Sequence, residues 1–545
     1  MKFATIKEVS QMKRLLATLL AMCIVLSVPF ARAEEDGPLT PYADTVVVEM
    51  MMSDDPNVPF FNGETQDENV VEKFFRDYLN IDFQAKWLID STKYSEQLNL
   101  AINANTLPDM FVASKGQVAN MAEFGQIADL TDVYERYISD SAREVLEFQN
   151  GVAFQPVTIN GRIWALPLPN DFSDEITVMY IRKDWMESLN LEAPKTVDDL
   201  IDMAIAFATK DPDGNGVDDT FGIATDAGLN YIAELIGHPL GAYRGIWMAK
   251  DDGALEFSNV KDEYKEMLRI VNRLYHAGGI DKEFAVKDIN SMANDIAQGK
   301  CGIYPGSFWA IYWMLNMSMG NQIEAEWQAY PVIARADGAY QPRALDTTYR
   351  WLVVRNGYEH PEAAVKAINL WQEMWQGQYA AEYRALYSKD SGYDTDVKYY
   401  SPIFFDPPYK NVEKAAAVKK AIETGDASGL NEEQLVMYNN YLKALENGNR
   451  QAAWQAETDI AVFHILKDDY QLNFRYSDFN GPTTAVMSEL WPMVNQVTDV
   501  ATHEIIMGEP DQVDARFDQY VADWYAAGGN ELTKEVTAWY AENVK

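Results

Sequence analysis

Strand-like and helix-like patterns alternate along the first part of the chain. Residues 45–51 are rich in β-branched side chains and residues 83–89 alternate between apolar and polar, so both segments predict strands. Apolar residues recur at helical spacing over 70–78 and over 94–104, and a short buried strand is predicted at 110–112. This β-α-β-α-β order predicts a parallel sheet with helices on its faces, and therefore an α/β fold class.

The ends of two of these strands carry polar side chains. The first strand runs into Asp54 and Asp55, and the third runs into Ser114 and Lys115. Ligands of parallel sheets bind beyond the carboxyl ends of the strands. We therefore predict that these two loops belong to a ligand-binding cleft.

The remainder of the chain predicts a second lobe. A chain of 545 residues is longer than one core normally serves. Two extended segments joined by a Pro-rich stretch, 161–170 and 177–182, suit a crossing between lobes. The predicted organisation is a first part of lobe one over 41–168, lobe two over 169–340, a return to lobe one over 341–485 that includes a mostly helical insertion at 411–450, and C-terminal helices, mainly of lobe two, over 486–545.

The N-terminus predicts export. Lys13 and Arg14 precede a mostly apolar run over 15–30, and Ala31-Arg32-Ala33 follows. This order is typical of a signal peptide, so we predict removal of residues 1–33 and an extracytoplasmic or cell-surface protein of a bacterium. The alternative is a lipid anchor on Cys23, which is disfavoured because Met22 stands where a lipoprotein box has a small residue.

The net charge limits the possible binding partners, and the cysteine content bears on the cellular compartment. The formal net charge is −38 and the predicted leader is basic, so the mature chain is more acidic still. Such a surface repels nucleic acids and anionic membranes. Once the leader is removed only Cys301 remains, which excludes an intrachain disulfide and fits a bacterial surface.

Several phrases resemble family 1 extracellular solute-binding proteins, in particular the large LipO-type branch. They are Tyr94-Ser-Glu-Gln-Leu-Asn-Leu-Ala101, Leu107-Pro-Asp-Met-Phe111, Tyr180-Ile-Arg-Lys-Asp-Trp185 and Gln298-Gly-Lys-Cys-Gly302. The resemblance implies a two-lobed periplasmic-binding-protein (Venus-flytrap) fold with crossing hinge strands. It also implies a monomer that captures a carbohydrate and delivers it to the permease of an ABC transporter, without enzymatic activity of its own.

The loop 211–219 has the spacing of a calcium site. Oxygen-bearing residues alternate and Gly216 stands at the sixth position, which lets a loop wrap a hard cation. Gly222 occupies the twelfth position, where an EF-hand has Glu, so a further ligand would come from elsewhere. The alternative is a plain Asp/Gly turn. We predict a structural Ca²⁺ held by Asp211, Asp213, Asn215, the Val217 carbonyl and Asp219.

Aromatic side chains predict the sugar-binding surface. Flat apolar rings match the C–H faces of sugars, while neighbouring polar groups bind the hydroxyls. We expect at least one of Trp247, Trp309 and Trp351 in the site, accompanied by Asp174 and Asp346.

Catalytic motifs are weak by comparison. The five histidines show no metal-ligand spacing, and no nucleophile elbow, P-loop or dinucleotide fingerprint occurs. A secreted glycoside hydrolase needs only two carboxylates, so pairs such as Asp54-Asp55 and Asp174-Glu175 keep that alternative open. A surface sugar sensor is a second alternative, and the sequence does not name the sugar.

Overall fold

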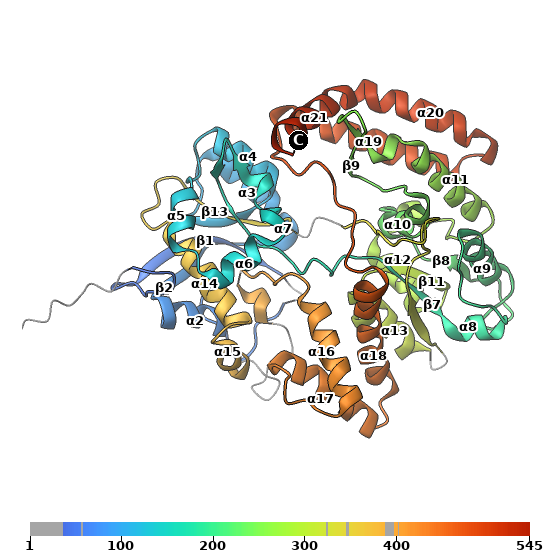
Figure 1. The fold of residues 1–545 in the computed structure, drawn as a ribbon, viewed down its shortest axis with the longest axis horizontal. Helices are drawn as coiled ribbons and strands as arrows, with labels where there is room; N and C mark the ends of the chain where they lie inside the picture. The colour runs from blue at the N-terminus through green and yellow to red at the C-terminus, as the bar shows by residue number, and fades with distance from the viewer. Residues whose placement is uncertain are drawn as a thin grey trace, which may run out of the picture.

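The computed structural model describes residues 36–55, 58–322, 325–344, 348–386, 397–401 and 403–544. These residues form two lobes side by side, each with its own sheet (Figure 1). Lobe one has two sets of buried side chains, a larger one between Val46 and Phe405 and a smaller one between Met51 and Val353. Lobe two has one set, between Ile176 and Val536. The two-lobed α/β architecture predicted from the sequence is therefore present.

Lobe one is built on a five-stranded sheet in the order β2-β1-β3-β13-β6. Strands β1, β2 and β3 are parallel, and β13 runs antiparallel between β3 and β6. Helix α2 is held at its start by the Asn69 side chain, which accepts hydrogen bonds from two backbone amides, and ends at Asn80 with φ of 56°. The elements are β1 Val46–Asp54, α2 Val70–Leu79, β2 Ile81–Asp90, α3 Tyr94–Ala104, β3 Met110–Ala113, α4 Lys115–Glu123, α5 Thr131–Tyr137, α6 Asp140–Leu146, α7 Phe148–Gly151, β4 Thr158–Ile159, β5 Arg162–Ile163, β6 Leu166–Pro167, β13 Trp351–Val354, α14 Glu362–Trp375 and α15 Ala380–Leu386.

Lobe two is built on a four-stranded sheet in the order β12-β7-β11-β8. Strand β11 is buried along its whole length and pairs antiparallel with β7 and parallel with β8. Its elements up to the second crossing are β7 Val178–Arg182, α8 Lys183–Ser188, α9 Val197–Thr209, β8 Phe221–Ile223, α10 Asn230–Gly237, β9 Trp247–Ala249, β10 Leu255–Phe257, α11 Asp262–His276, α12 Ile289–Ala297, β11 Cys301–Gly306, the short helix η6 Phe308–Tyr312, α13 Met314–Asn321 and β12 Trp327–Tyr330.

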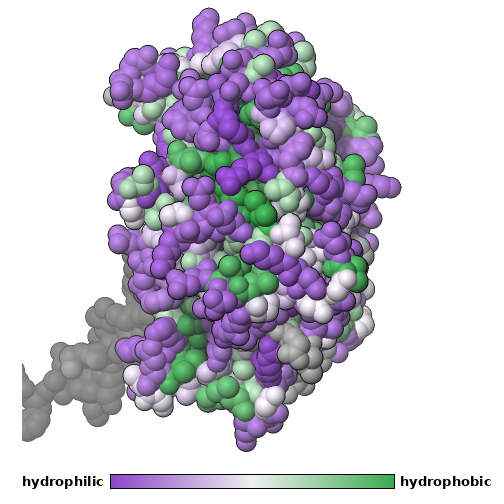
Figure 2. All heavy atoms as spheres, turned by 90° about the vertical axis from the view of Figure 1, so that its right-hand side faces the viewer, coloured by the Kyte–Doolittle hydropathy of each residue, from purple (hydrophilic) through white to green (hydrophobic). Residues whose placement is uncertain are grey.

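The C-terminal helices pack on lobe two. They are α16 Lys410–Thr424, α17 Glu432–Glu446, α18 Arg450–His464, α19 Ala485–Met507, α20 Val513–Trp524 and α21 Asn530–Asn543. The outer side of this lobe, near α8 and α11, is mainly hydrophilic with hydrophobic side chains in small groups (Figure 2). Among the described residues, no helix is long and apolar enough to cross a membrane.

The chain passes between the lobes from β6 to β7, from β12 to β13, and between Phe405 and Val412. The third passage corrects the predicted boundary, because we assigned 341–485 as a whole to the return to lobe one. Val412, Ala415 and Trp454 belong to the core of lobe two, and the Trp454 indole donates to the Trp327 carbonyl at 2.8 Å. The apolar spacing of a helix predicts a buried face but not the core that buries it.

Candidate functional site

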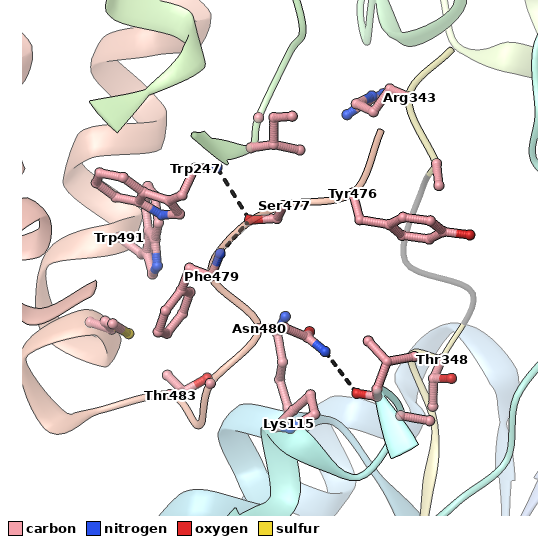
Figure 3. Close-up of a pocket in the computed structure, with 18 of the residues that line it drawn as sticks. Lys115, Trp247, Arg343, Thr348, Tyr476, Ser477, Phe479, Asn480, Thr483 and Trp491 are labelled. Carbon is pink, nitrogen blue, oxygen red and sulfur yellow. Dashed lines mark hydrogen bonds between the residues drawn. The ribbon is translucent and has the colours of Figure 1, made fainter. Parts of the chain in front are cut away.

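A cavity of about 620 Å³ lies between the lobes. Lys115, Ala153 and Trp351 line it from lobe one, and Trp247 and Trp491 line it from lobe two. An irregular segment, residues 475–484, runs through it between α18 and α19, and we call this segment the strap (Figure 3). We call the whole space the inter-lobe cavity. Its volume is that of a site for a small molecule.

Aromatic rings form one wall of the inter-lobe cavity. The Trp247 ring lies 6.1 Å from that of Trp491, which lies 5.5 Å from Phe257. Phe479 of the strap lies on the same side (Figure 3). Trp247 is only 3% exposed, so it supports the wall, whereas Trp491 is less buried and offers more of its ring. Such a wall suits a ligand with apolar C–H faces.

The strap is fixed mainly to lobe two. Asp478 binds the Arg475 guanidinium through two bonds of 2.9 and 2.6 Å and accepts the Ala249 amide at 2.7 Å. The Ser477 hydroxyl accepts the amides of Trp247 and Phe479, each at 3.2 Å. Its position is therefore preorganised with respect to the aromatic wall.

Two strap residues reach lobe one. The Tyr476 hydroxyl accepts a hydrogen bond from the Gln149 side-chain amide at 3.4 Å. The Asn480 amide donates to the Val152 carbonyl at 2.7 Å, across the boundary between the lobes. At the next position, a side chain on Gly481 would lie 2.5 Å from the Trp539 ring, so this turn needs glycine. The strap thus touches both lobes at the point where a ligand would be enclosed.

Cationic groups lie at the cavity rim. Lys115 begins α4, whose N-cap Ser114 forms a capping box with Gln117. Arg343 donates its backbone amide to the Glu234 carboxylate at 2.6 Å and its guanidinium to the Arg244 carbonyl at 2.5 Å. Burial raises the pKa of Glu234, and the Arg343 charge opposes that change. No Asp or Glu lines the inter-lobe cavity among the residues that the structure describes.

Beside the cavity, two crossing segments are joined by buried charges, which we call the hinge network: Asp171, Asp174, Asp406, Lys410 and Asn411. Asn411 donates its backbone amide to Asp171 and its side-chain amide to Asp174, both at 2.7 Å. Burial raises the pKa of Asp174 well above its ordinary value, and the charges of Asp171 and Asp406 add to the shift. Burial also acts to raise the pKa of Asp406, but the ammonium groups of Lys410 and Lys398, each 3.0 Å away, outweigh it and hold that pKa far below its usual range.

The carboxylates of the predicted calcium loop accept hydrogen bonds from the Asn215 side chain and from backbone amides of the loop. The Asn215 side chain donates to Asp213 at 2.9 Å and to Asp219 at 3.3 Å, while Asp211 accepts the backbone amides of Asn215 and Gly216 at 3.1 and 3.0 Å. Burial raises the pKa of Asp213, and the neighbouring Asp211 and Asp219 raise it further.

The donor set of this loop suits a hard cation, although it is not arranged around one. Within the described part of the chain, no group of three or more His, Cys, Asp or Glu is set for a metal ion. Gly222 cannot be exchanged for the missing twelfth ligand, because a side chain there would lie 2.4 Å from the Ala204 carbonyl oxygen. A bound cation would take the place of the Asn215 amide as partner of the carboxylates.

Comparison with known proteins identifies the family. Residues 62–374, more than half of the chain, match the model of the bacterial extracellular solute-binding proteins. The chain belongs to this family. A solute-binding protein needs a site between two lobes, and the inter-lobe cavity has that position.

Individual relatives cover the chain to different extents. The polygalacturonan/rhamnogalacturonan-binding protein YtcQ of Bacillus subtilis is 32% identical over 42% of this chain and 44% of its own length. Lipoprotein LipO of the same organism is 23% identical over 86% of this chain and 88% of its own. The fructooligosaccharide ABC transporter substrate-binding protein FusA of Streptococcus pneumoniae is 26% identical over 57% of each chain. A solved structure of its EF-hand mutant with fructo-nystose aligns over 91% of this chain and 99% of that chain with a TM-score of 0.60 at 17% identity, which shows a shared fold.

The structure of this solute-binding protein brings together only some of the predicted ligand residues. Lys115, Trp247 and Trp351 line the inter-lobe cavity. Ser114 caps α4 beside it, and Asp54 and Asp55 lie at the end of β1 without lining it. Asp346 lies outside the described residues, as do the predicted leader and Cys23.

Two further residues of the predicted ligand-binding set lie outside the inter-lobe cavity of this solute-binding protein. Trp309 packs near Tyr231 and Trp313, with ring centroids 6.3 and 6.0 Å away, and does not line the inter-lobe cavity. Asp174 belongs to the hinge network, where it holds Asn411. A position in the sequence next to a crossing did not distinguish a hinge carboxylate from a ligand-binding one.

The strap and Trp491 line the inter-lobe cavity but were not predicted from the sequence. The strap contributes five lining side chains between two helices: Tyr476, Ser477, Phe479, Asn480 and Thr483. The available signal was an Asn480-Gly481-Pro482 turn flanked by aromatic residues in a stretch without helical periodicity.

Proposed function

We propose that this protein captures an oligosaccharide in the inter-lobe cavity and delivers it to the permease of an ABC transporter. The observation that carries the proposal is the cavity itself, with an aromatic wall on lobe two and polar groups from the strap and from Lys115. Rings cover the C–H faces of a sugar, while amides and hydroxyls bind its hydroxyl groups. The relatives support the ligand class, because YtcQ is a polygalacturonan/rhamnogalacturonan-binding protein and FusA a fructooligosaccharide-binding one.

In this proposal the protein binds its sugar without hydrolysing it, and it acts outside the cytoplasm as a monomer. Glycoside hydrolysis requires two carboxyl groups beside the scissile bond. The described residues that line the cavity include neither Asp nor Glu, which favours a binding role. The permease and its ATPase would supply the energy of transport. We also propose that residues 1–33 are removed, so that the mature protein begins at Glu34. N-terminal mass spectrometry tests this, and a diacylated Cys23 at the N-terminus would contradict it.

The experiment is a glycan screen on the purified mature protein. Pectin fragments, fructooligosaccharides and other oligosaccharides are first tested for a rise in melting temperature, and each positive is titrated by calorimetry. We expect saturable binding of at least one class, with the bound sugar recovered intact by chromatography. Shortened sugars in the recovered fraction would identify a hydrolase instead, and no binding across the panel would refute the carbohydrate assignment.

We also propose that the loop 211–219 holds a structural calcium ion. Alternating oxygen donors, positive φ at Gly214 and Gly216, and the raised pKa of Asp213 all favour a cation among these carboxylates. The ligands would be Asp211, Asp213, Asn215, the Val217 carbonyl and Asp219. FusA, whose EF-hand has been mutated in a solved structure, supports the proposal.

Chelation tests the calcium proposal. An ion that binds only the folded state at 100 times its Kd stabilises the protein by about 2.7 kcal/mol, so a chelator should lower the melting temperature. Asp213→Ala should abolish that effect and leave sugar affinity within a few fold. Asp218→Ala, an exposed neighbour outside the predicted ligand set, is the matched control and should keep the chelator response. Identical melting curves of the wild type with and without chelator would count against the site.

A further inference from the structure

The short helix α7 of lobe one is a left-handed turn rather than a regular helix. Gln149 and Asn150 have φ of 51° and 59°, and Gly151 has φ of 71°. L-residues adopt this conformation singly in turns but rarely in succession, because the Cβ atom comes too close to the next carbonyl oxygen. Helix α7 lies on the side of lobe one that faces lobe two (Figure 1). Its backbone is therefore strained at the boundary between the lobes.

Two hydrogen bonds join this turn to the strap. The Gln149 side-chain amide donates to the Tyr476 hydroxyl at 3.4 Å. Directly after the turn, the Val152 carbonyl accepts the Asn480 amide at 2.7 Å (Figure 3). Because the strap is fixed mainly to lobe two, both bonds cross from one lobe to the other.

A ring contact adds to these bonds. The Phe148 ring, at the start of the turn, meets the Tyr409 ring edge to face with 5.5 Å between the centroids. Tyr409 packs against the core of lobe two. Phe148 and Val152 lie on either side of the left-handed turn, so the shape of the turn determines whether both can contact lobe two at once.

Backbone strain gathers around these contacts. Asn, Asp and Gly adopt positive φ more readily than other residues, so their left-handed positions elsewhere are ordinary turns. Among the described residues, five of other types have positive φ: Gln149, Leu229, Tyr409, Gln471 and Leu472. Gln149 and Tyr409 make the contacts between α7 and lobe two, and Gln471 and Leu472 lie just before the strap. Such strain persists only where the surrounding structure holds it, and it is typical of ligand clamps and switch regions.

We propose that α7 and the strap form an inter-lobe latch, which limits how far the two lobes separate before a ligand binds. When the latch opens, its contacts are lost and the left-handed turn relaxes, so a gain in one offsets a loss in the other. Val152 and Asn480 line the inter-lobe cavity, and the closed latch therefore forms part of its wall. A ligand that contacts both lobes closes them further from this arrangement.

Position 150 tests the strain without removing a contact. Asn150 is exposed, and its side chain makes none of the three contacts with lobe two. Valine is β-branched and adopts positive φ much less readily than Asn, so Asn150→Val should shift the equilibrium towards the open latch about tenfold. Asn150→Gly should keep the latch closed. Asn160→Val is the matched control, since Asn160 is exposed with φ of 53° in the turn between β4 and β5 of the same lobe.

Single-molecule FRET measures the separation of the lobes in the ligand-free mature protein. Dyes are attached at Glu135→Cys on α5 and at Glu187→Cys on α8, both exposed positions, while Cys301 is buried. We expect a single FRET population in the wild type, in Asn150→Gly and in Asn160→Val. A second population with a longer distance between the dyes should appear in Asn150→Val. It should also appear in Phe148→Ala, which loses the ring contact with Tyr409.

Two results would overturn the proposal. One is a single, wild-type FRET population in both Asn150→Val and Phe148→Ala, with circular dichroism showing that both are folded. The other is the second population in Asn160→Val, because strain anywhere in lobe one would then separate the lobes. These measurements use no sugar, so failure of the latch is distinguishable from failure of the carbohydrate assignment.

Discussion

Among the side chains that line the inter-lobe cavity, Trp491 is the one whose truncation we expect to reduce ligand affinity most. It is less buried than Trp247 and adjoins both Trp247 and Phe257. Trp491→Ala removes ring area that would cover a sugar face. We expect affinity for the saccharide found by the glycan screen to fall by about 1–3 kcal/mol, as measured by calorimetry.

Trp309→Ala is the matched comparison. Trp309 is another partly buried tryptophan of lobe two, but it does not line the cavity. Its variant should bind within a few fold of the wild type, with melting curves used to confirm folding of both variants. Equal losses of affinity in the two variants would place the ligand elsewhere on lobe two.

At the residue level, a local rule was enough to predict that Lys115 lies at the inter-lobe cavity, while its role in binding a ligand stays a prediction. Lys115 follows a parallel strand, and such strand ends meet at the ligand-binding edge of a sheet. Trp491 lies on a long helix whose spacing indicates only that some face is buried. It reaches the cavity because α19 packs against β9 and β10 residues more than 200 positions earlier, and no local pattern carries that information.

The hinge network joins two crossing segments through buried charges, and these make the free energy of unfolding depend on pH. The pKa of Asp174 lies above the value of about 3.9 expected in the unfolded chain. Between those two values the folded state keeps a proton that the unfolded state has lost, so the stability contributed by this group falls as pH rises through the window. Asp174→Asn cannot ionise. It should raise the free energy of unfolding at pH 7 and change it little at pH 4, as measured by urea unfolding.

Asp406→Asn should behave in the opposite way. Its pKa is depressed, so it contributes stability above the unfolded value and loses it as pH falls. The variant deprives the ammonium groups of Lys398 and Lys410 of this carboxylate, and we expect a loss of about 3–5 kcal/mol at pH 7. Because the folded pKa of Asp406 lies far below 4, the loss caused by Asp406→Asn should still be present at pH 4 and shrink only at lower pH. If Asp174→Asn changes the free energy of unfolding equally at pH 4 and pH 7, the hinge network does not control the pH dependence.

At the level of elements, the sequence predicted whether a segment is a helix or a strand better than it predicted which elements pack together. The β-α-β-α-β start of lobe one corresponds to β1, α2, β2, α3 and β3, because its apolar periods are strong and its caps are local. The helical segment 411–450 was also recognised. Its docking on lobe two depends on contacts such as that of Trp454 with Trp327, which link residues 127 positions apart.

The whole molecule should close around its ligand. Two lobes joined by crossing segments can rotate about a hinge, and a ligand that contacts both favours the closed form only by its difference in affinity for the two states. We expect the radius of gyration from small-angle scattering to fall when the bound saccharide is added. A glycan that failed in the screen is the control and should leave the curve unchanged. Tight binding without contraction would rule out the clamp mechanism.

The position of strand β13 in the sequence also determines when lobe one can finish folding during synthesis. It lies between β3 and β6 in lobe one, yet it follows the whole four-stranded sheet of lobe two in the sequence. As synthesis proceeds, the centre of the first sheet stays open until residue 354 has emerged, and such non-local pairing is slow. If the protein is exported as proposed, this delay keeps lobe one from being completed before the chain has crossed the membrane.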